Sequence, residues 1–353
     1  MENDILSLRL KNQQLLEPQL KNPKDLVSWF GAIQSQDLPG AKWALGQRLG
    51  LNNKDISLSY EKGEILRTHV MRPTWHFVTG DDIYWLLKLT GDRVKAVMRT
   101  YTRGFGVTEE TIEKCTKIFE KELKNNPMTR KEIGEMLSKY GFKWEGNGLA
   151  HIVSICELNA VLTSGPMKGN QTTYALLNQR TTHKTFTRDE ALKEITRKYF
   201  QSHGPALLKD FAWWSGLTIK DGLLGLEQNS KVQKETVDGK TYYFFKTELP
   251  KNTDKVFLLP NYDEYTVAYR DRELLYGNVD KTKLDARGDA LFNNAVLING
   301  KVEGIWRKIR KPKEMILDMR LFRNLDKKER ELLNEITLEF SSFLSFPVKL
   351  TIS

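Results

Sequence analysis

Two glutamines separated by one serine, Gln34-Ser35-Gln36, form the residue pattern in this chain that is best suited to chemistry. A side-chain amide is no general base near neutral pH, but its carbonyl oxygen can orient a water molecule and its NH₂ group can donate hydrogen bonds. Such a pair suits a hydrolysis whose leaving group is already activated, because positioning the water then provides much of the acceleration. The alternative is that both amides only satisfy backbone groups between two helices.

The flanking segments decide whether both glutamines can serve one site. Asn22-Pro23 is typical of a helix start, and apolar residues recur at helical spacing from there to Ile33. Asp37-Leu38-Pro39-Gly40 starts a second helix. Residues two apart share a side only in an extended chain, so a shared site requires the backbone to unwind near Ser35. Asp37 either caps the second helix, which we prefer, or assists the glutamines as a base.

Composition favours a nucleic-acid partner. The 353 residues include 55 Lys+Arg and 45 Asp+Glu, which gives a net charge of +10 and an isoelectric point near 9.3. That excess favours a polyanion, nucleic acid before membrane. Cys115 and Cys156 form no disulfide framework, and no Cys/His grouping has zinc-ligand spacing, so we expect neither a metal nor another cofactor. The acidic N-terminus has no apolar signal core, which predicts a cytoplasmic, nucleoid-associated protein without membrane contact.

One order of elements occurs three times, at intervals of roughly 80 to 100 residues. In each copy helical patterns with capping signals are followed by two alternating runs around a turn, such as those around Arg72-Pro73 and Asp238-Gly239. Helices followed by a hairpin are the order of a winged helix, a helix-turn-helix with a β-hairpin wing. We therefore predict winged-helix units over residues 1–100, 101–183 and 184–249.

The character of the chain changes after Pro250. Short apolar runs that favour strands alternate with turn signals such as Asn299-Gly300, and Asp326 caps a long helix that continues to about Phe343. Residues 250–353 are therefore predicted to form a mainly antiparallel sheet with one long helix. The fold class is α+β, with three tandem winged-helix units followed by this C-terminal module.

Several stretches resemble the AlkZ/YcaQ family of winged-helix DNA glycosylases, which carries a Gln-x-Gln or Gln-x-Asp catalytic motif. The similarity is spread over nearly the whole chain in the order that the family has. The matching stretches are Gly31–Gln36, Leu66–Val78, Ser202–Pro205 with Phe211–Gly216, and Leu259–Tyr265 with Tyr269–Arg272.

The resemblance implies that Gln34 and Gln36 are catalytic and that the enzyme is monofunctional, with no lysine Schiff base, no metal and no cofactor. The middle position of the family's motif is commonly apolar or small, and Ser35 is small but carries a hydroxyl. An N-alkylated purine is positively charged, so its glycosidic bond is weakened beforehand, whereas an unmodified base would need protonation and a carboxylate base. The expected partner is double-stranded DNA containing alkylated purines, with bulky adducts or interstrand crosslinks as further substrates, bound by a monomer.

Basic side chains of three segments are the candidate DNA contacts. On the first hairpin, Arg67 and Arg72 would hold phosphates and His76 would line the groove beside the glutamines; a merely solvated hairpin is the alternative. The run from Trp306 to Lys313 contains five basic residues and no acidic one, which indicates either a phosphate-contact surface or a basic edge strand. The predicted DNA-binding residues are Arg67, Arg72, His76, Lys240, Arg307, Lys308 and Arg310.

Two other interpretations compete with the glycosylase. In one, the chain is a non-enzymatic winged-helix DNA-binding protein or transcriptional regulator, and the glutamines are structural. In the other, Asp263 and Glu264 hydrolyse a different substrate. Adjacent carboxylates on a strand point to opposite faces, so we expect this pair, with Arg270-Asp271-Arg272 nearby, to form an ion-pair corner between the last module and the third unit.

Overall fold

The order helix, strand, helix, helix, hairpin recurs in the computed structural model, which describes residues 2–144, 146–277, 279 and 293–352. The first copy has its three strands in the order β1-β3-β2. This is the arrangement of a winged helix. Its elements are α2 (Pro23–Phe30), β1 (Ile33–Gln34), α3 (Leu38–Leu49), α4 (Asn53–Lys62), β2 (Ile65–Val70) and β3 (Arg72–Thr79).

The other two copies keep this order. In the second, the sheet order β4-β6-β5 matches that of the first copy, and in the third an isolated bridge between Ala206 and Tyr243 replaces the first strand. The second copy comprises α6 (Glu109–Glu122), β4 (Met128–Thr129), α7 (Arg130–Lys139), α8 (Gly148–Leu158), β5 (Leu162–Ser164), β6 (Thr173–Leu176) and α9 (Leu177–Arg180); the third comprises α10 (Arg188–Ser202), α11 (Leu208–Ser215), α12 (Ile219–Glu227), β7 (Val232–Val237) and β8 (Lys240–Phe245).

Local capping explains where many of these helices begin. Asn22 accepts a hydrogen bond from the backbone N–H of Asp25 and starts α2 at Pro23. Thr129, Thr187 and Thr218 each form a reciprocal capping box with the acidic residue three positions later, at the starts of α7, α10 and α12. Two further helices lie outside the three copies: α1 (Glu2–Asn12) precedes the first copy, and α5 (Gly80–Gly104) connects the first copy to the second. Helix α5 continues past residue 100, where the first predicted unit ends. The predicted unit boundaries at residues 100, 183 and 249 stay predictions.

The C-terminal module is a five-stranded sheet in the order β13-β12-β11-β10-β9, antiparallel except for the pair β12 and β13. The predicted α+β class with a mainly antiparallel sheet and a long helix is therefore confirmed. Strand β11 has a strand on either side, but β10 pairs with it only as far as Trp306. Among the described residues, Arg307–Arg310 of the basic run pair with β12 alone, so the interpretation of this run as a basic edge strand stays a prediction. The elements are β9 (Val256–Leu259), α13 (Glu264–Val267), α14 (Glu273–Tyr276), β10 (Asn294–Ile298), β11 (Lys301–Arg310), β12 (Met315–Leu321), α15 (Lys327–Leu344) and β13 (Val348–Ile352).

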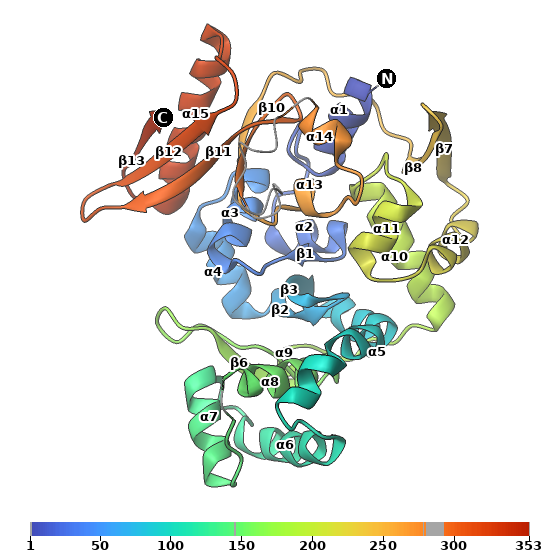
Figure 1. The fold of residues 1–353 in the computed structure, drawn as a ribbon, viewed down its shortest axis with the longest axis vertical. Helices are drawn as coiled ribbons and strands as arrows, with labels where there is room; N and C mark the ends of the chain where they lie inside the picture. Colours follow the sequence, from blue (N-terminus) through green and yellow to red (C-terminus); the bar gives the residue numbers. More distant parts are fainter. Residues whose placement is uncertain (1, 145, 278, 280–292, 353) are drawn as a thin grey trace.

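The small sheet of the first unit lies between two hydrophobic cores. One face contributes Leu66 and Val78 to a core shared with α5 and with the second and third units. The other face contributes Ile33 and Phe77 to a core shared with α2, α3, the C-terminal sheet and α15. Figure 1 shows the first unit in the middle, with the C-terminal sheet, the second unit and the third unit around it. Strand β1, which carries Gln34, is thus held from both sides. Among the described helices, none has the length and apolar character that crossing a bilayer requires.

Candidate active site

The glutamine motif lies on extended backbone. Helix α2 ends at Phe30 because Gly31 adopts φ +84°, a conformation that favours glycine. In β1 the residue opposite Gln34 is His76 of β3. The pairing continues one residue further, since the Ser35 N–H donates to the Trp75 carbonyl at 2.8 Å. The expected unwinding of the backbone near Ser35 is present.

The two amides lie at different depths. Gln34 is 6% exposed, and its Oε1 is buried without a hydrogen-bond partner among the described residues. Gln36 is exposed, and its Oε1 accepts a long hydrogen bond of 3.4 Å from the Trp75 N–H. If the amides only bonded backbone groups between two helices, the contact of Gln36 would be explained. The side-chain oxygen of Gln34 would not, because a buried acceptor without a hydrogen bond is costly.

A neutral histidine and an arginine lie beside Gln34. The Nδ1 of His76 is 2.9 Å from the Thr74 carbonyl, and its Nε2 is 3.3 Å from a terminal nitrogen of Arg72. Burial, with a further contribution from the Arg72 charge, lowers the pKa of His76 well below its usual value. His76 is therefore neutral, donates from Nδ1 to Thr74 and accepts from Arg72 at Nε2. The Arg72 Nε is buried without a partner among the described residues, as is the Gln34 Oε1.

Arg67 binds the backbone of the motif. Its Nε donates to the Ser35 carbonyl at 3.0 Å, and a terminal nitrogen donates to the Gln36 carbonyl at 3.3 Å. Its guanidinium carbon lies 4.4 Å from the centre of the Trp75 ring. These contacts hold the extended motif from strand β2, which lies on the far side of β3 from β1.

The acidic pair was expected on a strand but lies at the start of a short helix. Asp263 is the N-cap of α13, and Glu264 is its first residue. Asp263 forms two hydrogen bonds of 2.8 Å with Arg48 of α3, and the two side chains are 0% and 2% exposed. The expected ion-pair corner to the third unit is present at Asp271, which pairs with Lys209 and Lys240, but Asp263 does not take part in it, because its ion pair runs to the first unit.

Glu264 contacts the motif itself. One oxygen, Oε1, accepts the backbone N–H of Gln34 at 2.6 Å. The other, Oε2, lies 3.0 Å from the indole nitrogen of Trp214 and 3.3 Å from the Nε2 of His203. Both partners of Oε2 belong to the third unit and are fully buried. Trp75, Glu264, His203 and Trp214 were not predicted as site residues; the only sequence signal for them is that they fall within the stretches that resemble the glycosylase family.

The structure brings together five of the predicted residues, namely Gln34, Gln36, Arg67, Arg72 and His76. The rest lie elsewhere. Lys240, on the hairpin of the third unit, is 3.0 Å from Asp271 and 2.9 Å from Glu273, and these carboxylates raise its pKa. Arg307, Lys308 and Arg310 are exposed on β11 of the C-terminal sheet. Asp37 is the N-cap of α3 but makes no capping hydrogen bond with its side chain, so that predicted contact is absent.

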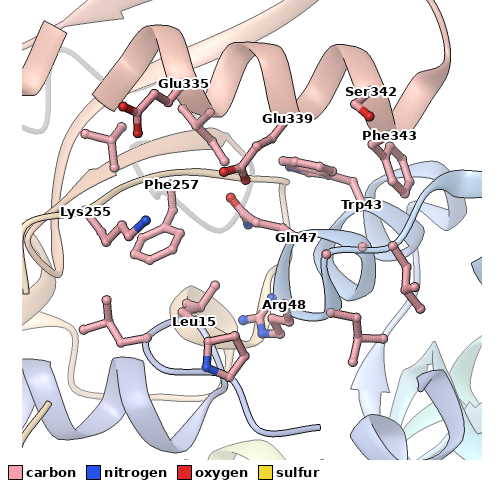
Figure 2. A pocket seen from close by; sticks show the side chains of 18 of the residues that line it. Leu15, Trp43, Gln47, Arg48, Lys255, Phe257, Glu335, Glu339, Ser342 and Phe343 are labelled. Carbon is pink, nitrogen blue, oxygen red and sulfur yellow. The ribbon is translucent and has the colours of Figure 1, made fainter. Parts of the chain in front are cut away.

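A groove of about 690 Å³ lies away from these residues, between α15, the end of α3 and the segment that precedes β9. Its lining includes Trp43, Phe257 and Phe343, and none of the predicted site residues. Figure 2 shows Glu339 of α15 and Gln47 of α3 directed toward each other across it. The groove and the glutamine motif are separate features.

Comparisons with known proteins identify the family and the fold. A family model described as DNA glycosylase AlkZ-like matches residues 27–343. The interstrand DNA cross-link repair glycosylase of Streptomyces sahachiroi is 21% identical over 314 residues, which cover 83% of this chain and 84% of that protein. The solved structure of Streptomyces sahachiroi DNA glycosylase AlkZ has a TM-score of 0.80 and 19% identity and covers 99% of both chains, so the fold is shared.

Proposed function

The chain belongs to the AlkZ-like family and is a DNA glycosylase, and on this premise we propose that it hydrolyses the N-glycosidic bond of cationic N-alkylated purines with a water molecule positioned by Gln34 and Gln36. The observation that carries the proposal is the Oε1 of Gln34, which is buried and has no hydrogen-bond partner in the part of the chain that the structure describes. The interpretation as a non-enzymatic regulator is set aside, because membership in the family makes the chain an enzyme.

A water molecule is the natural partner of that oxygen. The Gln34 Oε1 is an acceptor and the Arg72 Nε is a donor, and both lack partners among the described residues. His76, the residue opposite Gln34, also contacts Arg72 at 3.3 Å, so the three side chains belong to one cluster. A water molecule there would satisfy the acceptor and the donor at once. Gln36, exposed above Gln34, would contact the same water from the DNA side.

The chemistry then needs no strong base. As the bond between C1′ and the purine nitrogen breaks, its electron pair neutralises the positive charge of the alkylated ring, and the sugar becomes an oxocarbenium-like cation. The water oxygen bonds to C1′ and its proton passes to solvent. Amide carbonyl dipoles that face the sugar stabilise the developing charge. His76 contributes no base, since its Nε2 accepts from Arg72 and its pKa is lowered by burial.

The leaving group decides which DNA is a substrate. An uncharged base would leave as an anion and would need an acid, which the glutamine cluster does not provide. We therefore propose cationic purines as substrates. The similarity to a relative named for interstrand cross-link repair supports the inclusion of purines that are crosslinked through an alkylated ring nitrogen. A lesion that is already destabilised in the stack is also easier to expose.

A panel of duplexes tests the proposal. Single-turnover release would be measured from duplexes with 7-methylguanine, 3-methyladenine, hypoxanthine or uracil, and from a duplex whose purines are joined through their N7 atoms. We expect release of the two cationic purines and of the crosslinked purine, and none of hypoxanthine or uracil. Equal release of neutral and cationic bases would contradict the leaving-group argument.

A further inference from the structure

The third unit and the C-terminal module determine where the catalytic strand lies, through one buried carboxylate. We propose that Glu264 is a positioning residue for Gln34, an inference that rests on the proposed role of the glutamines. The contact is the 2.6 Å hydrogen bond from the Gln34 backbone N–H to Glu264 Oε1. Glu264 is 1% exposed, so water does not compete for this bond.

The carboxylate itself is held rigidly. Its Oε2 accepts from Trp214 at 3.0 Å and lies 3.3 Å from His203, both from the third unit. The preceding residue, Asp263, is fixed to Arg48 on α3 by two bonds of 2.8 Å. Helix α13, which lies near β1 in Figure 1, is therefore tied to the first unit through Gln34 and Arg48 and to the third unit through Trp214. The backbone N–H of Gln34 therefore donates to a carboxylate oxygen whose position is fixed.

This contact decides the position of the reacting side chain, because the Gln34 Oε1 has no partner of its own among the described residues. The place of that oxygen depends on the backbone of β1, and a shift of about 1 Å in a reacting group can reduce a rate about 10²-fold. The carboxylate also adds a negative charge behind the strand, in a region of low dielectric, where it favours a cationic sugar. Glu264 does not touch the substrate, so it acts through Gln34.

A carboxylate suits this place because it only accepts hydrogen bonds, and both the Gln34 backbone N–H and the Trp214 indole N–H donate to it. In Glu264→Gln, one amide oxygen could serve either Gln34 or Trp214, while the NH₂ group would face the other N–H. In Glu264→Asp, the charge remains but the shorter side chain withdraws from Gln34. Both variants keep much of the packing and should weaken the hold on Gln34.

Asp210 provides the matched control. It is also fully buried and accepts backbone N–H groups, at 3.0 Å each, from Leu207, Arg270 and Asp271. Like Glu264 it joins the third unit to the C-terminal segment, but its hydrogen bonds among the described residues do not reach the glutamine motif. Asp210→Asn should therefore lower the melting temperature much as Glu264→Gln does, and should change the rate of base release less than threefold.

The experiment measures single-turnover release of 7-methylguanine at saturating enzyme, DNA affinity by fluorescence anisotropy, and melting temperature. We expect Glu264→Gln and Glu264→Asp to reduce the rate about 10- to 100-fold, with affinity unchanged within twofold. In a Gln34→Ala background, Glu264→Gln should reduce the residual rate less than threefold, because the residue through which it acts is gone.

Three results overturn the inference: a wild-type rate in Glu264→Gln, a loss in Asp210→Asn as large as that in Glu264→Gln, or a full loss that persists in the Gln34→Ala background. A wild-type enzyme that releases no alkylated base contradicts the proposed function instead, so the two failures are distinct.

Discussion

Breaking the ion pair between Arg48 and Asp263 should destabilise the whole chain, because this pair locks the C-terminal module to the first unit. The two side chains are 2% and 0% exposed and are joined by two bonds of 2.8 Å. In Asp263→Asn the Asn oxygen can still accept the Tyr265 N–H at the start of α13, so the helix cap is kept and the loss reports the ion pair.

Removing one partner of a buried ion pair leaves an uncompensated charge and costs about 3–5 kcal/mol. The lower end applies here, because Arg48 keeps hydrogen bonds to the Gln13 and Ala44 carbonyls. With an unfolding entropy of about 2.1 cal/mol/K per residue, 353 residues give about 0.74 kcal/mol/K if the chain unfolds as one unit. Asp263→Asn should therefore lower the melting temperature by about 4 °C.

The assay is thermal unfolding followed by circular dichroism, and Asp318→Asn is the control. Asp318 pairs with Arg307 at 2.6 Å, but the arginine side chain is 74% exposed, so this pair contributes less than about 1 kcal/mol. The expected shift for the control is below about 1.5 °C. Equal shifts in the two variants would refute the conclusion that the buried pair holds the module in place.

Three further predictions follow from single contacts. Burial lowers the pKa of His76, so the stability that the neutral side chain contributes is lost as pH falls below the unfolded pKa of about 6.5. His76→Gln should therefore flatten the decline of unfolding free energy between pH 6.5 and 5, measured by urea titration. An unchanged slope would contradict the lowered pKa of His76. Gly216→Ala should destabilise more than Gly239→Ala, although φ is +70° and +74°, because only the first new Cβ would meet a backbone oxygen, that of Met71 at 2.2 Å; equal melting temperatures would argue against that contact. Lys308→Met should reduce the slope of log affinity against log salt concentration by about one. Lys240→Met should change this slope little, because the charge of Lys240 is paired with Asp271 and Glu273. The reverse order of the two variants in anisotropy titrations would contradict this assignment.

The repeated order of elements could be predicted from the sequence because its signals are local. The capping boxes at Thr129, Thr187 and Thr218, and the turn at Asp238-Gly239, each depend on residues within four positions of one another. Strand β1 could not be predicted, because two residues show no alternation and the strand forms only by pairing with β3. Its extended backbone was nevertheless required by the spacing of the two glutamines.

The residues around the glutamine motif could not be predicted from the sequence for a different reason. Glu264 contacts Gln34 across 230 positions and Trp214 across 50, and no local pattern encodes such contacts. The acidic pair was placed on a strand because the four residues of α13 are too few to show helical periodicity. The pair of amides by itself is also compatible with a structural role between two helices, and the resemblance to the glycosylase family is what assigns it the catalytic one.

In the proposed mechanism two amides, without a carboxylate base, position the water that attacks the sugar. The most direct test is the single-turnover rate of 7-methylguanine release by the wild type, Gln34→Ala and Gln36→Ala, with DNA affinity measured on the same duplex. We predict that each substitution reduces the rate at least about 100-fold while the dissociation constant changes less than threefold. Release at the wild-type rate by Gln34→Ala would contradict the claim.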